Sequence, residues 1–290
     1  MAERFLIINA DDFGLCPSVN EAVSRLFAQR RITSASLLAS ASCALDAVVF
    51  ALENGLPVGV HWTLYSEWQE EPFSCAADKD EIPSLLARGV LPADGGLKAR
   101  KARSREVTRE LDAQALSVLK RDIRIDHADS HGGTLYGMNG RLFFLNAFRL
   151  CRKYRLPFRF PRSGLFLKRQ LGFKPSKAIR AAHRVIVVLA DLHKVLLPDD
   201  MLTNPYPVKQ IGSYENLREY YFREIKDLKS GVTELFMHPS LPDPELRNRT
   251  PEWQKREWEY RLLMEPEFHA LIRAEGIRLV SWKDAPLKGR

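Results

Sequence analysis

The chain has 290 residues, of which 45% are hydrophobic and 28% are charged, and its net charge is +8. This is an ordinary globular composition, long enough for one large core rather than a disordered or fibrous chain. The first apolar run has only five residues before Asp11, too short for a signal peptide or a membrane span. Four widely separated cysteines without a paired motif favour a reduced, cytoplasmic protein.

The excess of lysine and arginine is concentrated in residues 98–109 and 149–184. A solvated basic face is the ordinary interpretation, and a surface that meets phosphate, nucleic acid or an anionic membrane is the alternative. No helix-turn-helix, zinc-finger or aromatic RNA-binding signature accompanies the charge, so we expect no nucleic-acid partner.

Seven short apolar or β-branched runs, bounded by turn residues, predict strands. In chain order they are Arg4–Ala10, Ile32–Ala39, Pro57–Leu64, Ile123–Ser130, Leu156–Phe160, Thr233–His238 and Ile277–Trp282. Apolar residues at helical spacing predict helices at Ser18–Arg30, Cys43–Asn54, Arg105–Lys120, Leu142–Lys153, Tyr214–Lys229 and Glu267–Glu275. Ser18 and Glu21 predict a capping box at the start of the first helix.

Alternation of strands and helices along the whole length predicts an α/β fold with a parallel sheet, and this number of units favours a closed or nearly closed barrel. We expect a single domain over residues 1–290. The segments 66–96 and 161–207 interrupt the alternation and read as insertions that cover a substrate.

Unusual polar residues stand at the ends of the predicted strands. Asp11 and Asp12 follow the first strand, and His61 lies near the end of the third. The other positions are Asp129 and His131 after the fourth strand, Arg159 and Arg162 at the fifth, and His238 at the end of the sixth. Strand ends meet on one face of a barrel, so these side chains can gather there. Two histidines with one carboxylate are typical of catalytic zinc, and non-haem iron is also allowed.

Each of these residues also has a structural interpretation. Paired aspartates after a strand can cap a helix or hold a turn, and a strand-end histidine is a core or surface residue about as often as a ligand. The coincidence at several strand ends favours a functional site. We expect His183, His193 and His269 to be structural because they lie in helical patterns. His127 lies two residues before Asp129, and we expect it to be a core residue, with a supporting partner of the site residues as the alternative.

The run Ile-Ile-Asn-Ala-Asp-Asp-Phe-Gly at 7–14, followed by Asn20-Glu21-Ala22, resembles the YdjC-like carbohydrate deacetylases. Further matching motifs are Thr33-Ser34-Ala35-Ser36, Gly59-Val60-His61, Asp129-Ser130-His131, Thr233-Glu234-Leu235 before His238-Pro239, Arg261, and Gly276-Ile277-Arg278-Leu279. They cover nearly the whole chain in family order. The resemblance implies an irregular seven-stranded (β/α) barrel of the glycoside hydrolase/deacetylase type. It also implies removal of an N-acetyl group from an amino sugar or oligosaccharide, such as a chitooligosaccharide.

The resemblance also implies roles for individual residues. Asp12, His61 and His131 would bind one divalent metal ion, with zinc favoured and magnesium or another divalent ion as alternatives. Asp11 would be the general base, and His238 the general acid or the group that steadies the oxyanion. Arg159 would orient the base or bind the sugar.

Two features leave parts of this assignment open. Neighbouring residues on an extended strand point in opposite directions, so Asp11 and Asp12 can both serve only if the chain turns there, which Gly14 allows. The family usually carries further histidines after Asp-Ser-His, whereas this chain continues with Gly132-Gly133-Thr134. The substrate pocket, and with it the identity of the sugar, is therefore open.

Two other functions remain as alternatives. One is a non-catalytic protein that binds a sugar or a lipid-linked sugar with a degenerate site. The other is a hydrolase of another amide or of a phosphoester, although phosphoesterases usually need two metals and more carboxylates.

The segment Ser176–Leu197 is basic at its start and strongly apolar after Val185. A core or subunit-interface helix is the ordinary interpretation. The alternative is peripheral membrane contact, in which Lys174, Lys177, Arg180 and Arg184 meet anionic headgroups. That arrangement would suit a sugar attached to a lipid carrier.

Overall fold

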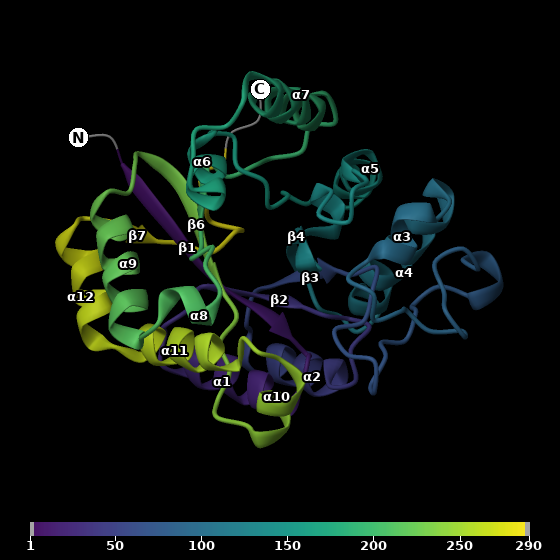
Figure 1. Ribbon diagram of the computed structural model, residues 1–290, viewed down its shortest axis with the longest axis horizontal. Helices are drawn as coiled ribbons and strands as arrows, with labels where there is room; N and C mark the ends of the chain where they lie inside the picture. The colour runs from purple at the N-terminus through teal and green to yellow at the C-terminus, as the bar shows by residue number, and fades with distance from the viewer. Residues whose placement is uncertain (1–2, 288–290) are drawn as a thin grey trace.

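The computed structural model describes residues 3–287 and contains one parallel sheet surrounded by helices (Figure 1). Six strands are hydrogen-bonded in the order β4-β3-β2-β1-β6-β5, and β7 pairs with the start of β1. The strands are β1 (Arg4–Phe13), β2 (Ser34–Leu37), β3 (Val58–Trp62), β4 (Ile125–Ser130), β5 (Asp200–Leu202), β6 (Gly231–Met237) and β7 (Arg278–Leu279). Every pairing is parallel, so the predicted α/β barrel class is confirmed.

The helices follow the strands in the alternation that the sequence predicts. They are α1 (Pro17–Ala28), α2 (Ala44–Asn54), α3 (Leu97–Lys101), α4 (Ser104–Leu119), α5 (Phe144–Tyr154), α6 (Leu165–Leu171), α7 (Lys177–Leu192), α8 (Val208–Ile211), α9 (Tyr214–Lys226), α10 (Pro244–Arg249), α11 (Trp253–Met264) and α12 (Pro266–Ala274), with 3₁₀ turns η1 (Lys79–Glu81) and η2 (His131–Tyr136). None of the helices in residues 3–287 has the length and hydropathy needed to cross a bilayer.

The prediction of a fifth strand at Leu156–Phe160 was wrong. Only one bridge forms there, between Ala128 of β4 and Phe158. Pro157 lies within this segment and Pro161 follows it, and because proline has no N–H the hydrogen-bond ladder cannot extend through them. The segment still connects β4 to the chain before β5, since Arg159 N–H donates to Ala128 O at 3.0 Å and Phe158 N–H donates to Leu196 O at 2.9 Å. Backbone hydrogen bonds therefore continue across the opening of the barrel.

The start of the first helix also differs from the prediction. Helix α1 begins at Pro17 with Cys16 as its N-cap, and no side chain caps it. Proline suits the first helical position because its fixed φ is already helical and its missing N–H would have no partner there. The capping box of Ser18 and Glu21 is therefore absent, and Glu21 instead accepts a hydrogen bond from Arg25 at 2.7 Å.

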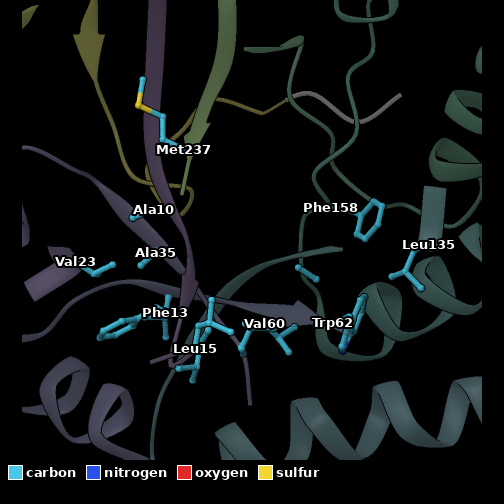
Figure 2. Close-up of a cluster of buried hydrophobic side chains, with 14 of the residues drawn as sticks. Ala10, Phe13, Leu15, Val23, Ala35, Val60, Trp62, Leu135, Phe158 and Met237 are labelled. Atoms are coloured by element: carbon cyan, nitrogen blue, oxygen red, sulfur yellow. The ribbon is translucent and has the colours of Figure 1, made fainter. Parts of the chain in front are cut away.

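The core lies against the strands and their helices, and Figure 2 shows some of its side chains, including Phe13, Val60 and Trp62. Trp62 is fully buried, and its indole N–H donates to Leu111 O at 2.8 Å. Burial of a large apolar side chain contributes about 1.5–3 kcal/mol. These contacts hold the carboxyl ends of β1 and β3 in fixed positions, where the candidate site lies.

Candidate metal centre

A bulge at the end of β1 determines how the two aspartates point. Strand β1 runs through to Phe13, so Asp11 and Asp12 lie within it and not after it as predicted. Phe13 comes three positions after Ala10 on β1, whereas their partners on β2, Ala35 and Leu37, are only two positions apart. Asp12 has a φ of +65°, which is unusual for a residue other than glycine. The bulge breaks the strand alternation, and both carboxylates reach the same rim of the barrel.

Asp12 meets two imidazoles at this rim. Its Oδ1 lies 3.3 Å from His61 Nε2 and 3.1 Å from His131 Nδ1, and all three residues are buried. Two ligands of a tetrahedral zinc ion, each about 2.0–2.1 Å from the metal, stand about 3.3 Å apart. His61 Nε2 has no hydrogen-bond partner among the described residues. The spacing and this unpartnered nitrogen fit a divalent cation shared by the three side chains.

A second layer of charged groups orients the three candidate ligands. Asp129 Oδ1 lies 2.6 Å from His61 Nδ1, and Glu67 Oε2 lies 2.9 Å from His131 Nε2. Arg256, on α11, donates to the other oxygen of Asp12, Oδ2, at 2.7 Å. Carboxylates on the outer nitrogen of a ligating histidine are typical of metal sites, because they fix the ring and its tautomer.

These contacts shift the pKa of each candidate ligand. Burial disfavours the charged carboxylate of Asp12, but Arg256 and the two imidazoles hold its pKa well below the usual value. Burial also disfavours protonated imidazoles, yet Asp129 and Asp12 raise the pKa of His61 to about 10. Asp12 and Glu67 likewise raise the pKa of His131 to about 9 against the effect of burial. A metal ion must therefore displace protons from both rings.

Arg159 binds three carboxylates beside this centre. It makes two hydrogen bonds to Asp11, Nη1 to Oδ2 at 2.6 Å and Nη2 to Oδ1 at 2.8 Å. Its Nε donates to Glu234 at 2.9 Å, and Nη2 lies 2.9 Å from Asp129 Oδ2. Arg159 is only 2% exposed, so its guanidinium contacts these three carboxylates and not solvent. Bidentate pairing of this kind fixes the plane of the Asp11 carboxylate.

Asp11, His61 and Asp129 form a second group with suitable spacing for a cation. Here, however, both oxygens of Asp11 and Oδ2 of Asp129 already face Arg159. The guanidinium supplies the positive charge that these carboxylates need. The first group, with Asp12, is therefore the better metal site.

His238 follows β6 directly and lies at the edge of the same rim. Its backbone N–H donates to Glu259 Oε2 at 2.7 Å, and its Nε2 lies 3.7 Å from Asp11 Oδ2. The side chain is 36% exposed, in contrast to the buried ligands. This imidazole therefore stands between the buried carboxylate and solvent, where a substrate can reach it.

The glycines after His131 have a steric explanation in this chain. Gly132 and Gly133 have φ of +52° and +65°, and a Cβ built on Gly132 would lie 2.1 Å from Tyr65 Oη. The Tyr65 ring stacks on His131 with 4.9 Å between ring centroids. Tyr65 thus occupies the space beside the candidate ligand that a side chain at 132 would need.

The remaining predicted residues lie outside the centre. Arg162 pairs with Asp191 on α7 and does not join the cluster around Arg159. His127 is buried, as expected, with its ring stacked on Trp282 at 4.7 Å, and its Nε2 lies 3.7 Å from Asp129 Oδ2, behind the candidate ligand His61. The other three histidines contact backbone carbonyl groups, as expected for structural residues; they are His183, His193 and His269.

Sequence reasoning missed three charged residues of the site, Glu67, Glu234 and Arg256. Glu234 carried a usable signal, since a glutamate within the apolar strand Thr233–Met237 must have a partner when it is buried. Glu67 and Arg256 carried none, because one lies in a long polar loop and the other in a helix rich in charged residues.

Comparisons with known proteins agree on one family. A family model described as YdjC-like protein matches residues 5–274. A carbohydrate deacetylase of Enterococcus faecalis is 29% identical to this chain, with 98% of each chain covered. A carbohydrate deacetylase of Geobacillus stearothermophilus is 27% identical over 97% of this chain and 98% of its own length.

A solved structure gives the same result for the fold. A proposed cellobiose-phosphate cleavage protein from Enterococcus faecalis superimposes with a TM-score of 0.75 and 28% sequence identity. The match covers 97% of this chain and 98% of the other. The arrangement of strands and helices is therefore shared over essentially the full length.

Proposed function

The chain belongs to the family of YdjC-like proteins, and from that premise we propose that it is a metal-dependent hydrolase that removes an N-acetyl group from an amino sugar. The observation that carries this proposal is the buried group of Asp12, His61 and His131, whose ligand atoms lie within 4.8 Å of one another. The products of the reaction are acetate and the free amine of the sugar.

Asp12, His61 and His131 are the proposed ligands of one divalent ion, with zinc favoured because two of the three donors are imidazole nitrogens. When bound, such an ion supplies a Lewis acid that polarises the amide carbonyl and makes the attacking water more acidic. Asp129, Glu67 and Arg256 keep the three ligands in place. They leave Asp12 Oδ1 and His61 Nε2 directed towards each other.

Asp11 is the proposed general base. Arg159 holds both of its oxygens, so the carboxylate is fixed in one orientation next to the candidate metal site. A positioned base that accepts the proton of the attacking water contributes about 10²–10⁴-fold to the rate. Since Arg159 is buried and engaged with carboxylates, we propose that it orients Asp11 and does not contact the sugar.

His238 is the proposed general acid. An amide nitrogen leaves only when it is protonated, and the protonating group must reach the substrate from the open side of the site. His238 is the partly exposed imidazole at this rim, and its Nε2 lies 3.7 Å from Asp11 Oδ2. At that separation, Asp11 and His238 can act on the same bound substrate, Asp11 by accepting a proton and His238 by donating one.

A test measures bound metal and released acetate together. Metal-free protein is loaded with zinc, magnesium or manganese and incubated with N-acetylated mono- and oligosaccharides. We expect acetate release that depends on the metal and is lost, together with bound metal, in His131→Ala. The matched control His193→Ala, which changes a histidine outside the centre, should retain both.

Two results would contradict the proposal. Metal uptake and sugar binding without acetate release would make the chain a binding protein. Metal retained in His131→Ala at the level of the unmodified protein would place the ion elsewhere.

A further inference from the structure

One part of the chain carries an extreme charge distribution. Residues 131–190 contain 13 lysines and arginines and no aspartate or glutamate. Their positive charge exceeds that of the whole chain, which is +8, so the rest of the protein is net negative. The positive charge is therefore concentrated in this stretch of sequence, within which Lys153, Arg159, Arg162 and Arg169 form ion pairs with acidic residues outside it.

The same region exposes most of the large apolar side chains. Of the 17 such side chains exposed among the described residues, eleven lie between positions 138 and 196. A monomeric soluble protein rarely exposes contiguous apolar surface, and where it does the surface usually meets a protein or a membrane. Exposed apolar and basic residues thus share this region, in which Asp191 on α7 pairs with Arg162.

Helix α7 shows the pattern most clearly. Its inward face carries His183 and Ala190, which are buried against the rest of the protein. Its outward face carries an apolar row at helical spacing, formed by Ala178, Ala181, Val185, Val188 and Leu192. The three larger members are 57%, 55% and 69% exposed. In Figure 1 this helix stands at the periphery of the molecule, beyond α5 and α6. The outward row therefore has no cover within the described chain.

Exposed basic side chains lie on α6, on α7 and in the segment between them. Lys168, Lys174, Lys177 and Arg184 are exposed, and none of them forms an ion pair with a described residue. The outward row of α7 together with these four cations is called the α7 face below. Side chains of this kind can extend towards anions while their methylene stems cover apolar surface.

We propose that the α7 face docks the protein onto the surface of an anionic lipid bilayer. The apolar row would enter the boundary between headgroups and acyl chains, and the cations would contact the anionic headgroups. This proposal concerns an interaction surface and does not depend on the proposed reaction.

Charge decides between a bilayer and the other partners that such a face could meet. Two copies joined through the α7 face would bring two unpaired cationic clusters together, and like charges across an interface cost several kcal/mol. A nucleic acid would match the cations but would leave Val185, Val188 and Leu192 without an apolar partner. An anionic bilayer offers both negative charge and an apolar layer.

The insertion that carries the α7 face also contacts the end of the strand that precedes His238. Phe166, on α6, packs on Phe236 with 6.3 Å between ring centroids, and Phe236 lies 6.2 Å from the ring of His238. The insertion that carries α6 and α7 therefore borders the open side of the site.

Vesicle binding tests the proposal. The intact chain is sedimented with vesicles of phosphatidylcholine alone and with vesicles that also contain phosphatidylglycerol, at low and high salt. We expect binding to the anionic vesicles that weakens with salt. Each lysine or arginine near an anionic surface changes binding about fivefold, so Lys174→Gln, Lys177→Gln and Arg184→Gln together should weaken binding about 100-fold. The triple variant Val185→Ser, Val188→Ser and Leu192→Ser should weaken binding about tenfold or more.

Two matched controls use features elsewhere on the surface. Leu45, Val49 and Leu52 form a similar exposed row on α2, which carries no lysine or arginine, and their serine variant should bind vesicles normally. Neutralisation of Lys98, Lys101 and Arg105 removes three exposed cations outside the α7 face and should have little effect. Far-UV circular dichroism and the thermal midpoint establish that each variant is folded.

Three outcomes would overturn the proposal. The first is equal binding to neutral and anionic vesicles, or no binding to either. The second is a dimer in sedimentation velocity that the Val185, Val188 and Leu192 variant converts to monomer, since the face would then join two copies. The third is tighter binding to single-stranded RNA than to anionic vesicles, with the same cations required.

Discussion

Replacing Asp129 by asparagine isolates the role of the groups behind the candidate ligands. Asp129 is fully buried, with Oδ1 2.6 Å from His61 Nδ1 and Oδ2 2.9 Å from Arg159 Nη2. Asparagine keeps the shape and one acceptor oxygen for His61 but removes the negative charge. Arg159 keeps Asp11 and Glu234 as partners, so its charge stays compensated. The variant should therefore fold while its His61 ring becomes a weaker ligand.

Loss of such an outer partner typically lowers metal affinity 10–100-fold, which corresponds to about 1.4–2.7 kcal/mol. Competition between the metal-free protein and a chromophoric chelator for zinc measures this change directly. The control is Glu106→Gln, because Glu106 is equally buried but bonds to Ser84, away from the site. Unchanged zinc affinity in folded Asp129→Asn, or an equal loss in the control, would show that the Asp129 carboxylate does not strengthen His61 as a ligand.

Three further predictions follow from the same geometry. Asp11→Asn should retain the metal and lower kcat about 10²–10⁴-fold, as measured by acetate release and metal content; loss of the metal would show that Asp11 is a ligand. Because the pKa values of His61 and His131 are raised to about 10 and about 9, both rings are protonated at neutral pH without metal, and zinc affinity should rise with pH, by at most about 100-fold per unit. Calorimetry in buffers of different ionisation enthalpy should count about two protons released, and pH-independent affinity would contradict these shifts. Gly59→Ala places a Cβ 2.3 Å from a buried imidazole and should lower the free energy of unfolding by about 1–3 kcal/mol in denaturant titrations. Gly164→Ala, with open space around it, should have little effect, and equal losses would remove the steric explanation.

Strand-end positions were predictable from the sequence. The apolar run before Asp11 marks a buried strand, and His61, His131 and His238 each lie at or just beyond the end of another strand. In a parallel barrel that position alone places a side chain on the shared rim. Periodicity and turn residues were therefore sufficient to bring these groups together.

Contacts between distant residues were not predictable. Arg256 binds Asp12 across 244 positions of sequence, and its helix reads as an ordinary charged surface helix. The bulge that turns Asp12 to the same rim as Asp11 depends on how β1 pairs with β2, which no local pattern encodes. Two predictions of secondary structure were wrong because of nearby prolines. Pro17 places the start of α1 before Ser18, and Pro157 and Pro161 reduce a predicted strand to a single bridge.

The position of a bound metal tests whether Asp12, His61 and His131 are its ligands. Crystals of the zinc-loaded protein, measured on both sides of the zinc absorption edge, locate the ion by its anomalous scattering. We predict one peak about 2.0–2.2 Å from Asp12 Oδ1, His61 Nε2 and His131 Nδ1. A fully loaded crystal whose only peak lies away from these three atoms would contradict it.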